Sequence, residues 1–347
     1  MKATYHKYIL NFKKPSGTSR GIITEKETWF IILENSGKRG IGECGILRSL
    51  SADDRPDYED KLKWTCENIH LSKEVLWEAL IEFPSIQFGV EMAFQSLESE
   101  NPFELFPSQF TAGKKSIPIN GLVWMGTEAE MKSQIEEKIA VGFKCIKLKI
   151  GAIDFEEELR LSRYIRSQFS AEEIEIRVDA NGAFKTEEAL EKLKRLSEFE
   201  IHSIEQPIAK NNIELMRELC EQTPFPVALD EELIGVFSFA DKEKLLEKIR
   251  PQYIILKPSF IGGFRGTQEW IDLANKYKIG WWITSALESN IGLNAIAQWT
   301  FLQNSSMPQG LGTGALYTNN FNCPLKVSQG QLWYDKNEIW DFSFENL

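Results

Sequence analysis

The chain has 347 residues, of which 42% are hydrophobic and 26% are charged, and its net charge at pH 7 is −11. This length and composition indicate a folded protein with a large core and more than one domain. The acidic balance and the absence of a basic stretch argue against nonspecific binding to nucleic acid.

The sequence shows no signal for a membrane or an oxidising compartment. No apolar run has the length of a signal-peptide core at the N-terminus or of a membrane span elsewhere. The five cysteines are scattered without a CxxC pair, and the three histidines form no HxH or HxxxH pair. Disulfides and zinc or non-haem iron sites are therefore not expected. We expect a cytoplasmic protein without a membrane partner, and the oligomeric state stays open.

Residues 1–112 predict an α+β domain. Strands are expected at residues 5–12 and 27–35, and residues 36–45 close a hairpin with the second of them. Residues 13–24 are rich in glycine, hydroxyl and basic side chains and predict a loop. Helical patterns then run from about residue 57 to residue 98, with Pro84 near the start of the second helix.

From residue 113 to residue 315, short apolar strands alternate with amphipathic helices. This alternation predicts an α/β fold with a closed (β/α)7β, TIM-like barrel. An open doubly wound sheet is the alternative, but the glycine-rich phosphate turn expected after its first strand is absent. Residues 316–347 predict strands and turns that return to the N-terminal domain and complete it as a cap. Seven helical stretches separate the expected strands, at residues 117–124, 145–149, 174–179, 203–205, 227–230, 253–257, 281–285 and 310–312.

Three acidic residues each end a predicted barrel strand. Asp179, Glu205 and Asp230 follow one another at intervals of about 25 residues, the length of one strand and one helix. Neighbouring strands lie about 4.8 Å apart, so the three carboxylates are expected to converge. Without a cation they would repel one another, and an all-oxygen ligand set favours Mg²⁺, with Mn²⁺ as the alternative. Taken singly, each acid could instead cap the following helix. The neighbouring Asn181 and Glu231 are either supports of the metal ligands or helix caps.

Lysines end the strands on either side of the acidic ones. Lys147 and Lys149 are two residues apart on the second strand, so both point to the same face, and Lys257 ends the sixth strand. Inward lysines need partners because burying an unpaired charge is costly, and an exposed edge strand is the alternative. A metal flanked by two amines suits proton abstraction next to a carboxylate.

The motifs KLK, VDAN, IEQP, ALDEE and LKPS occur in this order, one per strand. Together they resemble the enolase superfamily and its muconate-lactonizing-enzyme subgroup, over nearly the whole chain. Within the subgroup, KPSFIGG, TSALESNIGL and GLGTG are most similar to the o-succinylbenzoate synthase family. The resemblance implies a lyase of menaquinone biosynthesis. Its substrate would be a small dicarboxylate, 2-succinyl-6-hydroxy-2,4-cyclohexadiene-1-carboxylate, which it would dehydrate to 2-succinylbenzoate.

The same resemblance implies a role for each lysine. Lys149 would abstract the proton next to the metal-bound carboxylate, and Lys257 would stabilise the delocalised anion through a cation–π contact. Lys147 would orient Lys149 and tune its basicity.

Residues that are typical of related branches are missing from this chain, which reduces the number of families that it can resemble. No histidine follows His202, which excludes the mandelate racemase branch. The stretch Leu311-Gly312-Thr313-Gly314 lacks the Asp-x-Asp pair typical of dipeptide epimerases and the glutamate typical of muconate cycloisomerases. An N-succinylamino acid racemase, or an enzyme with both activities, would use the same two lysines and stays as the alternative.

Weaker signals outline the substrate pocket. Residues 13–22 match the mobile capping loop of the family, where Lys13, Lys14 and Arg20 would either screen the substrate carboxylates or form a solvated basic turn. Glu288 is expected to support the loop after the seventh strand. The remaining candidates for substrate contact lie at the ends of the seventh and eighth strands or shortly after them, and they are Ser285, Ser289, Asn290, Gly312 and Thr313.

Overall fold

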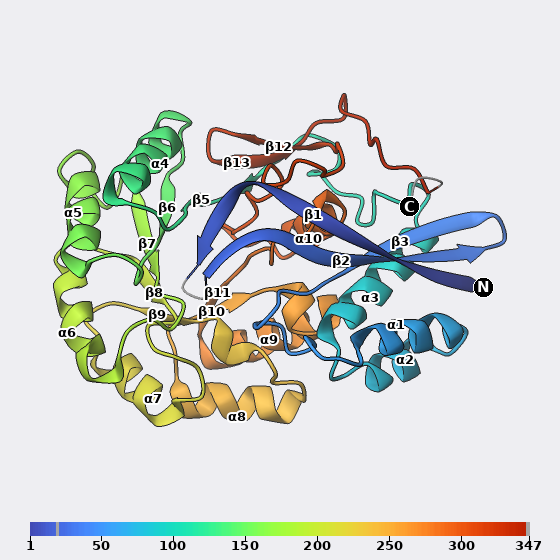
Figure 1. Ribbon diagram of the computed structural model, residues 1–347, viewed down its shortest axis with the longest axis horizontal. Coiled ribbons are helices and arrows are strands. Elements are labelled where there is room, and N and C mark those ends of the chain that lie inside the picture. The colour runs from blue at the N-terminus through green and yellow to red at the C-terminus, as the bar shows by residue number, and fades with distance from the viewer. Residues whose placement is uncertain (19–20, 345–347) are drawn as a thin grey trace.

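The computed structural model describes residues 1–18 and 21–344, and it shows a cap packed against a barrel (Figure 1). The cap consists of an antiparallel sheet in the order β1-β2-β3 and a group of helices against it. Helix α3 makes the main contact with the sheet, chiefly through β3. The cap elements are β1 (Lys2–Thr18), β2 (Gly21–Asn35), β3 (Lys38–Gly45), α1 (Tyr58–Glu67), α2 (Lys73–Ala79) and α3 (Pro84–Glu98).

Both faces of β2 are buried. Side chains alternate across a strand, so Trp29, Ile31 and Leu33 pack in the cluster that contains the helices. Phe30 points the other way and lies 5.7 Å from Phe321, measured between ring centroids, in the C-terminal segment. A strand covered on both sides is expected to be continuously apolar, which explains the run WFIIL.

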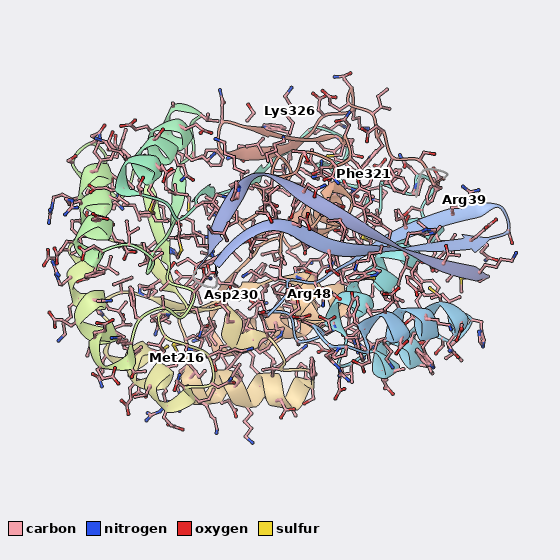
Figure 2. The ribbon with its side chains drawn as sticks, in the orientation of Figure 1. Arg39, Arg48, Met216, Asp230, Phe321 and Lys326 are labelled. Carbon is pink, nitrogen blue, oxygen red and sulfur yellow. The ribbon has the colours of Figure 1, made fainter. Side chains whose placement is uncertain are left out.

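The predicted loop at residues 13–24 is wrong. β1 continues to Thr18 and β2 begins at Gly21, and the two residues pair with each other. The register shifts between Asn11 and Ser16, and Pro15 lies inside that shifted stretch, where its missing N–H breaks no paired position. The long hairpin therefore extends from the cap to the barrel (Figure 2), where Lys13, Lys14 and Pro15 line a cavity together with barrel residues.

The second domain is a (β/α)7β barrel. Seven parallel strands lie in the order β11-β10-β9-β8-β7-β6-β5. Parallel bridges from Gln309 to Ile119 and from Gly310 to Thr284 connect the two edges, in place of the strand expected at 310–312. The strands are β5 (Gly121–Val123), β6 (Cys145–Lys149), β7 (Glu175–Asp179), β8 (Ser203–Glu205), β9 (Val227–Leu229), β10 (Tyr253–Leu256) and β11 (Gly280–Ile283). The helices are α4 (Glu128–Ala140), α5 (Phe155–Arg166), α6 (Thr186–Ser197), α7 (Ile213–Gln222), α8 (Phe239–Ile249), α9 (Gly263–Tyr277) and α10 (Asn290–Leu302), with short 3-10 turns η1 (Glu231–Leu233) and η2 (Pro258–Phe260).

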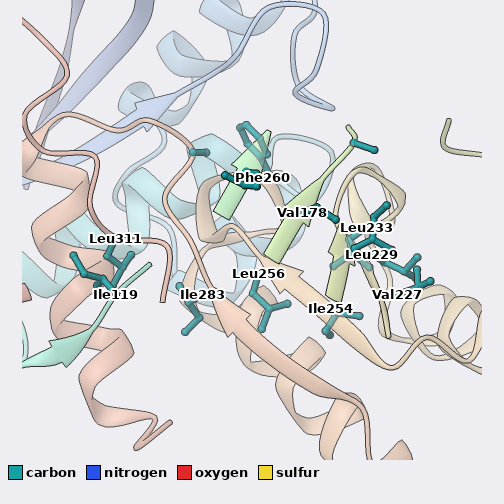
Figure 3. Close-up of a cluster of buried hydrophobic side chains, with 14 of the residues drawn as sticks. Ile119, Val178, Val227, Leu229, Leu233, Ile254, Leu256, Phe260, Ile283 and Leu311 are labelled. Atoms are coloured by element: carbon teal, nitrogen blue, oxygen red, sulfur yellow. The ribbon is translucent and has the colours of Figure 1, made fainter. Parts of the chain in front are cut away.

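Strand alternation separates an apolar outer layer from an inner face that carries the charged residues as well as a small apolar cluster of Ala228, Ile255 and Trp282. Ile146 and Leu148 on β6 belong to the main hydrophobic cluster and are fully buried. Val178, Leu229 and Ile283 from other strands lie in the same cluster (Figure 3). The charged residues between these positions consequently face the inside of the barrel, where they can form a site.

The C-terminal segment completes the cap and also contacts the chain just before the first barrel strand. Its hairpin of β12 (Leu325–Ser328) and β13 (Gln331–Tyr334) pairs with β4 (Ile117–Pro118) in a third sheet. Its aromatic residues pack on the cap sheet, including Phe321, which Figure 2 labels. We retain 1–112, 113–315 and 316–347 as proposed domain boundaries. Within the described part of the chain, no helix has both the length and the apolar character required to cross a membrane.

Candidate active site

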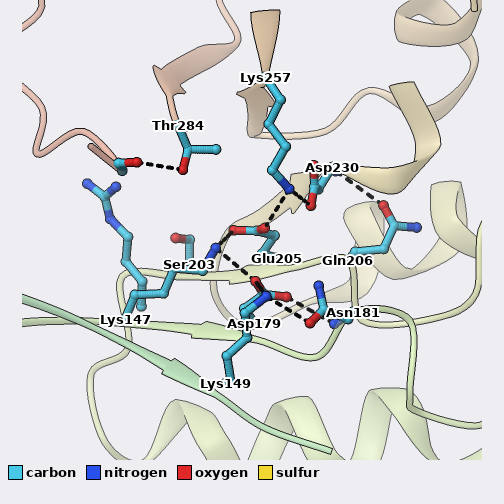
Figure 4. Close-up of polar contacts among 12 residues, drawn as sticks. Lys147, Lys149, Asp179, Asn181, Ser203, Glu205, Gln206, Asp230, Lys257 and Thr284 are labelled. Atoms are coloured by element: carbon cyan, nitrogen blue, oxygen red, sulfur yellow. Dashed lines mark hydrogen bonds and ion pairs between the residues drawn. The ribbon is translucent and has the colours of Figure 1, made fainter. Parts of the chain in front are cut away.

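The charged residues expected at the strand ends lie together at the C-terminal ends of β6 to β10 (Figure 4). The register of the sheet explains this, because Lys149 pairs with Asp179 and Asp179 pairs with Glu205 in adjacent strands. Residues at one level of a parallel sheet with the same inward orientation bring their side chains together. Asp230 and Lys257 immediately follow β9 and β10.

Lysines of β6 bridge the first two carboxylates. Lys147 Nζ lies 2.8 Å from Asp179 Oδ2 and 2.5 Å from Glu205 Oε2. Lys149 Nζ lies 2.6 Å from the same Asp179 oxygen. Lys147 and Lys149 therefore share an acceptor, which couples the positions of their ammonium groups.

The same pattern continues on the other side of the barrel. Lys257 Nζ donates a hydrogen bond to Asp230 Oδ2 and lies 4.0 Å from Glu205 Oε1. The contacts thus form a row of alternating charges that begins with Lys149 and ends with Asp230, the partner of Lys257. When all six groups are ionised, the row has three carboxylates and three ammonium groups, and its formal charge is balanced.

Burial makes the protonation of this row strongly interdependent. Burial raises the pKa of Glu205, and the negative charge of Asp179 raises it further, to about 8. Burial opposes ionisation of Asp179 as well, but Lys147 and Lys149 hold the pKa of this carboxyl well below its usual range. The carboxylates in turn raise the pKa of Lys147 and Lys257 despite the burial of these amines.

Asn181 and Glu231 lie beside the row and are linked to it. Asn181 Oδ1 accepts a hydrogen bond from Lys149 Nζ at 2.8 Å, and its Nδ2 donates to Glu231 Oε1 at 3.0 Å. Its backbone N–H donates to Asp179 Oδ1 at 3.0 Å. Asn181 therefore holds both an ammonium group and a carboxylate of the row.

Gln206 is a supporting residue that the sequence analysis missed. Its Oε1 accepts a hydrogen bond from the backbone N–H of Asp230 at 3.2 Å, and its Nε2 donates to Glu232 Oε2 at 3.1 Å. The side chain is fully buried, so these bonds fix the end of β9 against the end of β8. In the sequence, its position directly after Glu205 in the motif IEQP could have indicated this role.

A cavity of about 860 Å³ lies over the row of charges. The cap contributes Leu47 and Leu50 as well as the predicted Lys13 and Lys14. The barrel contributes the lysines of the row and the predicted Asn181, Ser285, Gly312 and Thr313. A hydrogen bond of 2.6 Å joins the hydroxyls of Ser285 and Thr313 across this wall. The cavity thus combines ammonium groups, hydroxyls and apolar surface.

Two predicted pocket residues lie elsewhere. Ser289 is fully buried, and its Oγ donates to Glu43 Oε2 of the cap at 2.5 Å. Asn290 Nδ2 donates to the Phe321 carbonyl at 2.6 Å. Neither residue lines the cavity, because the start of α10 turns both side chains towards the cap and the C-terminal segment. Arg20 lies outside the described residues.

The carboxylates fit a divalent cation in their chemistry. Asp179, Glu205 and Asp230 are at most 2% exposed and offer only oxygen donors, the set that Mg²⁺ and Mn²⁺ prefer. Glu205 Oε1 is buried and accepts no hydrogen bond from the described residues, so one ligand oxygen remains available. Among those residues the carboxylates do not form a single ligand cluster, because Lys147 lies between Asp179 and Glu205. Holding a metal therefore requires the amines to withdraw.

Comparison with known proteins identifies the family. Residues 130–336 match the family model described as "Enolase C-terminal domain-like". The o-succinylbenzoate synthase of Desulfotalea psychrophila is 46% identical, over 96% of this chain and 98% of its own length. The crystal structure of MenC from the same organism superimposes with a TM-score of 0.85 at 42% identity, covering 96% of this chain and 99% of that one. An N-succinylamino acid racemase from Amycolatopsis is 26% identical, over 70% of this chain and 65% of its own length. The chain therefore belongs to the enolase superfamily and, within it, to the o-succinylbenzoate synthase family.

Proposed function

We propose that this protein dehydrates 2-succinyl-6-hydroxy-2,4-cyclohexadiene-1-carboxylate to 2-succinylbenzoate, a step of menaquinone biosynthesis. The observation that carries the proposal is the row of charges below the cavity. It pairs Lys149 with Asp179 and Lys257 with Asp230, the first and the last of three buried carboxylates. A base on one side and a cation on the other suit removal of a proton next to a carboxylate.

A divalent cation, Mg²⁺ or Mn²⁺, held by Asp179, Glu205 and Asp230 would stabilise the negative charge that develops on the substrate carboxylate. A dicarboxylate substrate and a divalent cation carry equal and opposite charges, so they preserve the balance of the row. Binding of a cation by Asp179 and Asp230 would break the ion pairs of Lys149 and Lys257, and both lysines would then be available to the substrate.

Each lysine then has a separate task. Lys149, in its neutral form, takes the proton from the carbon that bears the carboxylate. Lys257 stabilises the delocalised anion through a cation–π contact from the other side. Lys147 would leave its place between Asp179 and Glu205 when the cation binds, and it would orient Lys149 from the same face of β6. The ammonium form of Lys149 then returns this proton to the ring hydroxyl, which leaves as water and gives the aromatic ring.

The walls of the cavity suit the rest of the substrate. Leu47, Leu50 and Phe260 offer apolar surface to the ring. We propose that Ser285 and Thr313 bind the succinyl part, with Gly312 leaving room beside them. We also propose that Lys13 and Lys14 of the hairpin, together with Arg20, screen its charge.

A spectrophotometric assay of the aromatic product tests the proposal. We expect turnover with Mg²⁺, none after chelation with EDTA, and recovery when Mg²⁺ is restored. Lys149→Ala and Lys257→Ala should each lower kcat by about 10²–10⁴-fold. Lys276→Ala, an exposed lysine on α9, is the control and should leave kcat unchanged. Full turnover in EDTA, or full activity of Lys149→Ala, would contradict the mechanism.

N-succinylamino acid racemization is a second candidate, because two lysines in the same cavity could serve as bases on either face of a carbon. Incubation of N-succinyl amino acids in D2O tests it. Racemization with exchange of the α-proton, lost in both lysine variants, would support this activity, and retention of the proton would exclude it.

A further inference from the structure

Two glutamates of the cap reach the N-termini of barrel helices. Glu43 of β3 accepts hydrogen bonds from the backbone N–H groups of Ser289 and Gly292 at the start of α10. Glu91 of α3 accepts from those of Phe264 and Arg265 at the start of α9. Carboxylates stabilise helix N-termini through these free donors and the helix dipole. Each glutamate therefore links the cap to a barrel helix.

The Glu43 carboxylate is completely enclosed. Oε1 accepts from Ser289 N at 2.9 Å and from Thr28 Oγ1 at 3.0 Å. Oε2 accepts from Gly292 N at 2.8 Å and from Ser289 Oγ at 2.5 Å. A side chain at position 292 would place its Cβ 2.8 Å from Glu43 Oε2, so glycine permits this approach. Each carboxylate oxygen thus holds one backbone N–H and one hydroxyl.

The network extends from Glu43 to the loops of the reacting residues. Glu288 is fully buried, and it accepts hydrogen bonds from the Ala286 backbone N–H at 2.7 Å and from Ser259 Oγ at 2.5 Å. Ser259 lies two residues after Lys257 in the sequence. Lys26 of the cap is also buried, and its Nζ has no hydrogen-bond partner among the described residues. The charges of Glu288 and Glu43 favour the ammonium form of Lys26 against the burial that lowers its pKa.

This network connects two walls of the cavity. On the cap side, Glu43 lies four residues before Leu47, which lines the cavity. On the barrel side, its partner Ser289 follows shortly after Ser285, Ala286 and Leu287, which line the cavity as well. We infer that Glu43 is a positioning residue that sets the distance between these walls and so determines how tightly the substrate is bound. This inference rests on the proposed function. It makes the cap a determinant of substrate fit through a residue that does not touch the substrate.

Glu43→Gln is the informative variant. Since each carboxylate oxygen accepts a different backbone N–H, an amide in either orientation turns its NH2 group towards one of them. The hydroxyls can rotate away, but the backbone N–H cannot. Glu91→Gln is the matched control, since its carboxylate also spans two backbone N–H groups of a barrel helix, and neither Phe264 nor Arg265 lines the cavity.

The kinetic test separates KM from kcat. For Glu43→Gln we expect KM to rise about tenfold with kcat changed less than about threefold, as expected when binding is lost equally in the ground and transition states. Glu91→Gln should keep both constants. A variant that only lost folded protein would show lower kcat at unchanged KM, and this result would overturn the inference, as would an unchanged KM.

Hydrogen exchange provides a test that needs no substrate. In Glu43→Gln, the amides of residues 286–293 should exchange faster, while those of residues 262–268 stay as in the wild type. The reverse pattern is expected for Glu91→Gln. Unchanged exchange at residues 286–293 would overturn the inference. A wild type without synthase activity would contradict the proposed function instead, and the exchange result would still decide whether Glu43 holds this loop.

Discussion

Lys147→Met removes an ammonium group that lies between two buried carboxylates. Asp179 and Glu205 are 0% and 2% exposed and lie 2.8 Å and 2.5 Å from Lys147 Nζ. Removing one partner from a buried ion pair typically destabilises a protein by about 3–5 kcal/mol, because the remaining charge is uncompensated. The unfolding entropy of a 347-residue chain is about 0.7 kcal/mol per degree, so the melting temperature should fall by about 4–7 °C.

Magnesium should partly reverse this loss. A divalent cation bound by the same carboxylates replaces the missing positive charge, and binding to the folded state raises its stability. In scanning calorimetry, Mg²⁺ should therefore raise the melting temperature of Lys147→Met more than that of the wild type, each measured against a sample in EDTA.

A surface lysine provides the control for this prediction. Lys194 is 58% exposed and lies 3.8 Å from Glu191 on α6, so Lys194→Met should change stability by no more than about 0.5 kcal/mol. The reasoning is refuted if Lys147→Met melts within about 1 °C of the wild type in EDTA. An equal magnesium effect on both proteins would refute the proposed ligand set.

Further predictions concern the barrel and its contact with the cap. Glu158 is buried and accepts from the Gly151 backbone N–H, and burial raises its pKa from the usual 4.5 to about 7. Between pH 4.5 and 7 the folded state thus keeps a proton on Glu158 that the unfolded state has lost. The stability that this proton contributes is complete below pH 4.5 and is lost as the pH rises through 7. Between pH 5.5 and 8.5, Glu158→Gln should consequently lose less stability in urea unfolding than the wild type, and an equal loss would contradict the assignment. Gly292→Ala should destabilise the protein by about 1–3 kcal/mol in the same assay because its Cβ would meet Glu43, whereas a neutral effect would show that α10 can move away. Phe88→Ala should cost about 3–5 kcal/mol, since Phe88 is fully buried against Phe264 across the cap–barrel contact, and a loss below about 1 kcal/mol would indicate that the cavity collapses.

Local sequence is sufficient to predict which charged residues gather in the barrel. A strand alternates with a period of two, which places Lys147 and Lys149 on the same face. A strand followed by a helix repeats after a nearly constant length, which places Asp179, Glu205 and Asp230 at successive strand ends. Both regularities come from backbone geometry, so they hold without knowledge of the surrounding structure.

Local composition misleads where a distant partner decides the conformation. Residues 13–24 have the composition of a loop, but most of them extend the β1–β2 hairpin because each strand satisfies the backbone groups of the other. At the eighth barrel strand the opposite happens, because a predicted strand is reduced to isolated bridges. Of the stretch expected at 310–312, only Gly310 forms a bridge, and with the bridge of the preceding Gln309 it is enough to connect the edges of the sheet.

The sequence by itself determined the barrel and the charged residues available at its mouth. Only the tertiary structure decided which residues form the walls of the cavity. Ser289 and Asn290 follow the seventh strand as Ser285 does, yet Ser289 bonds to Glu43, 246 residues away, and Asn290 bonds to the C-terminal segment. The physical reason is that a polar side chain turns to the partner that satisfies it when buried, and here that partner comes from another part of the chain.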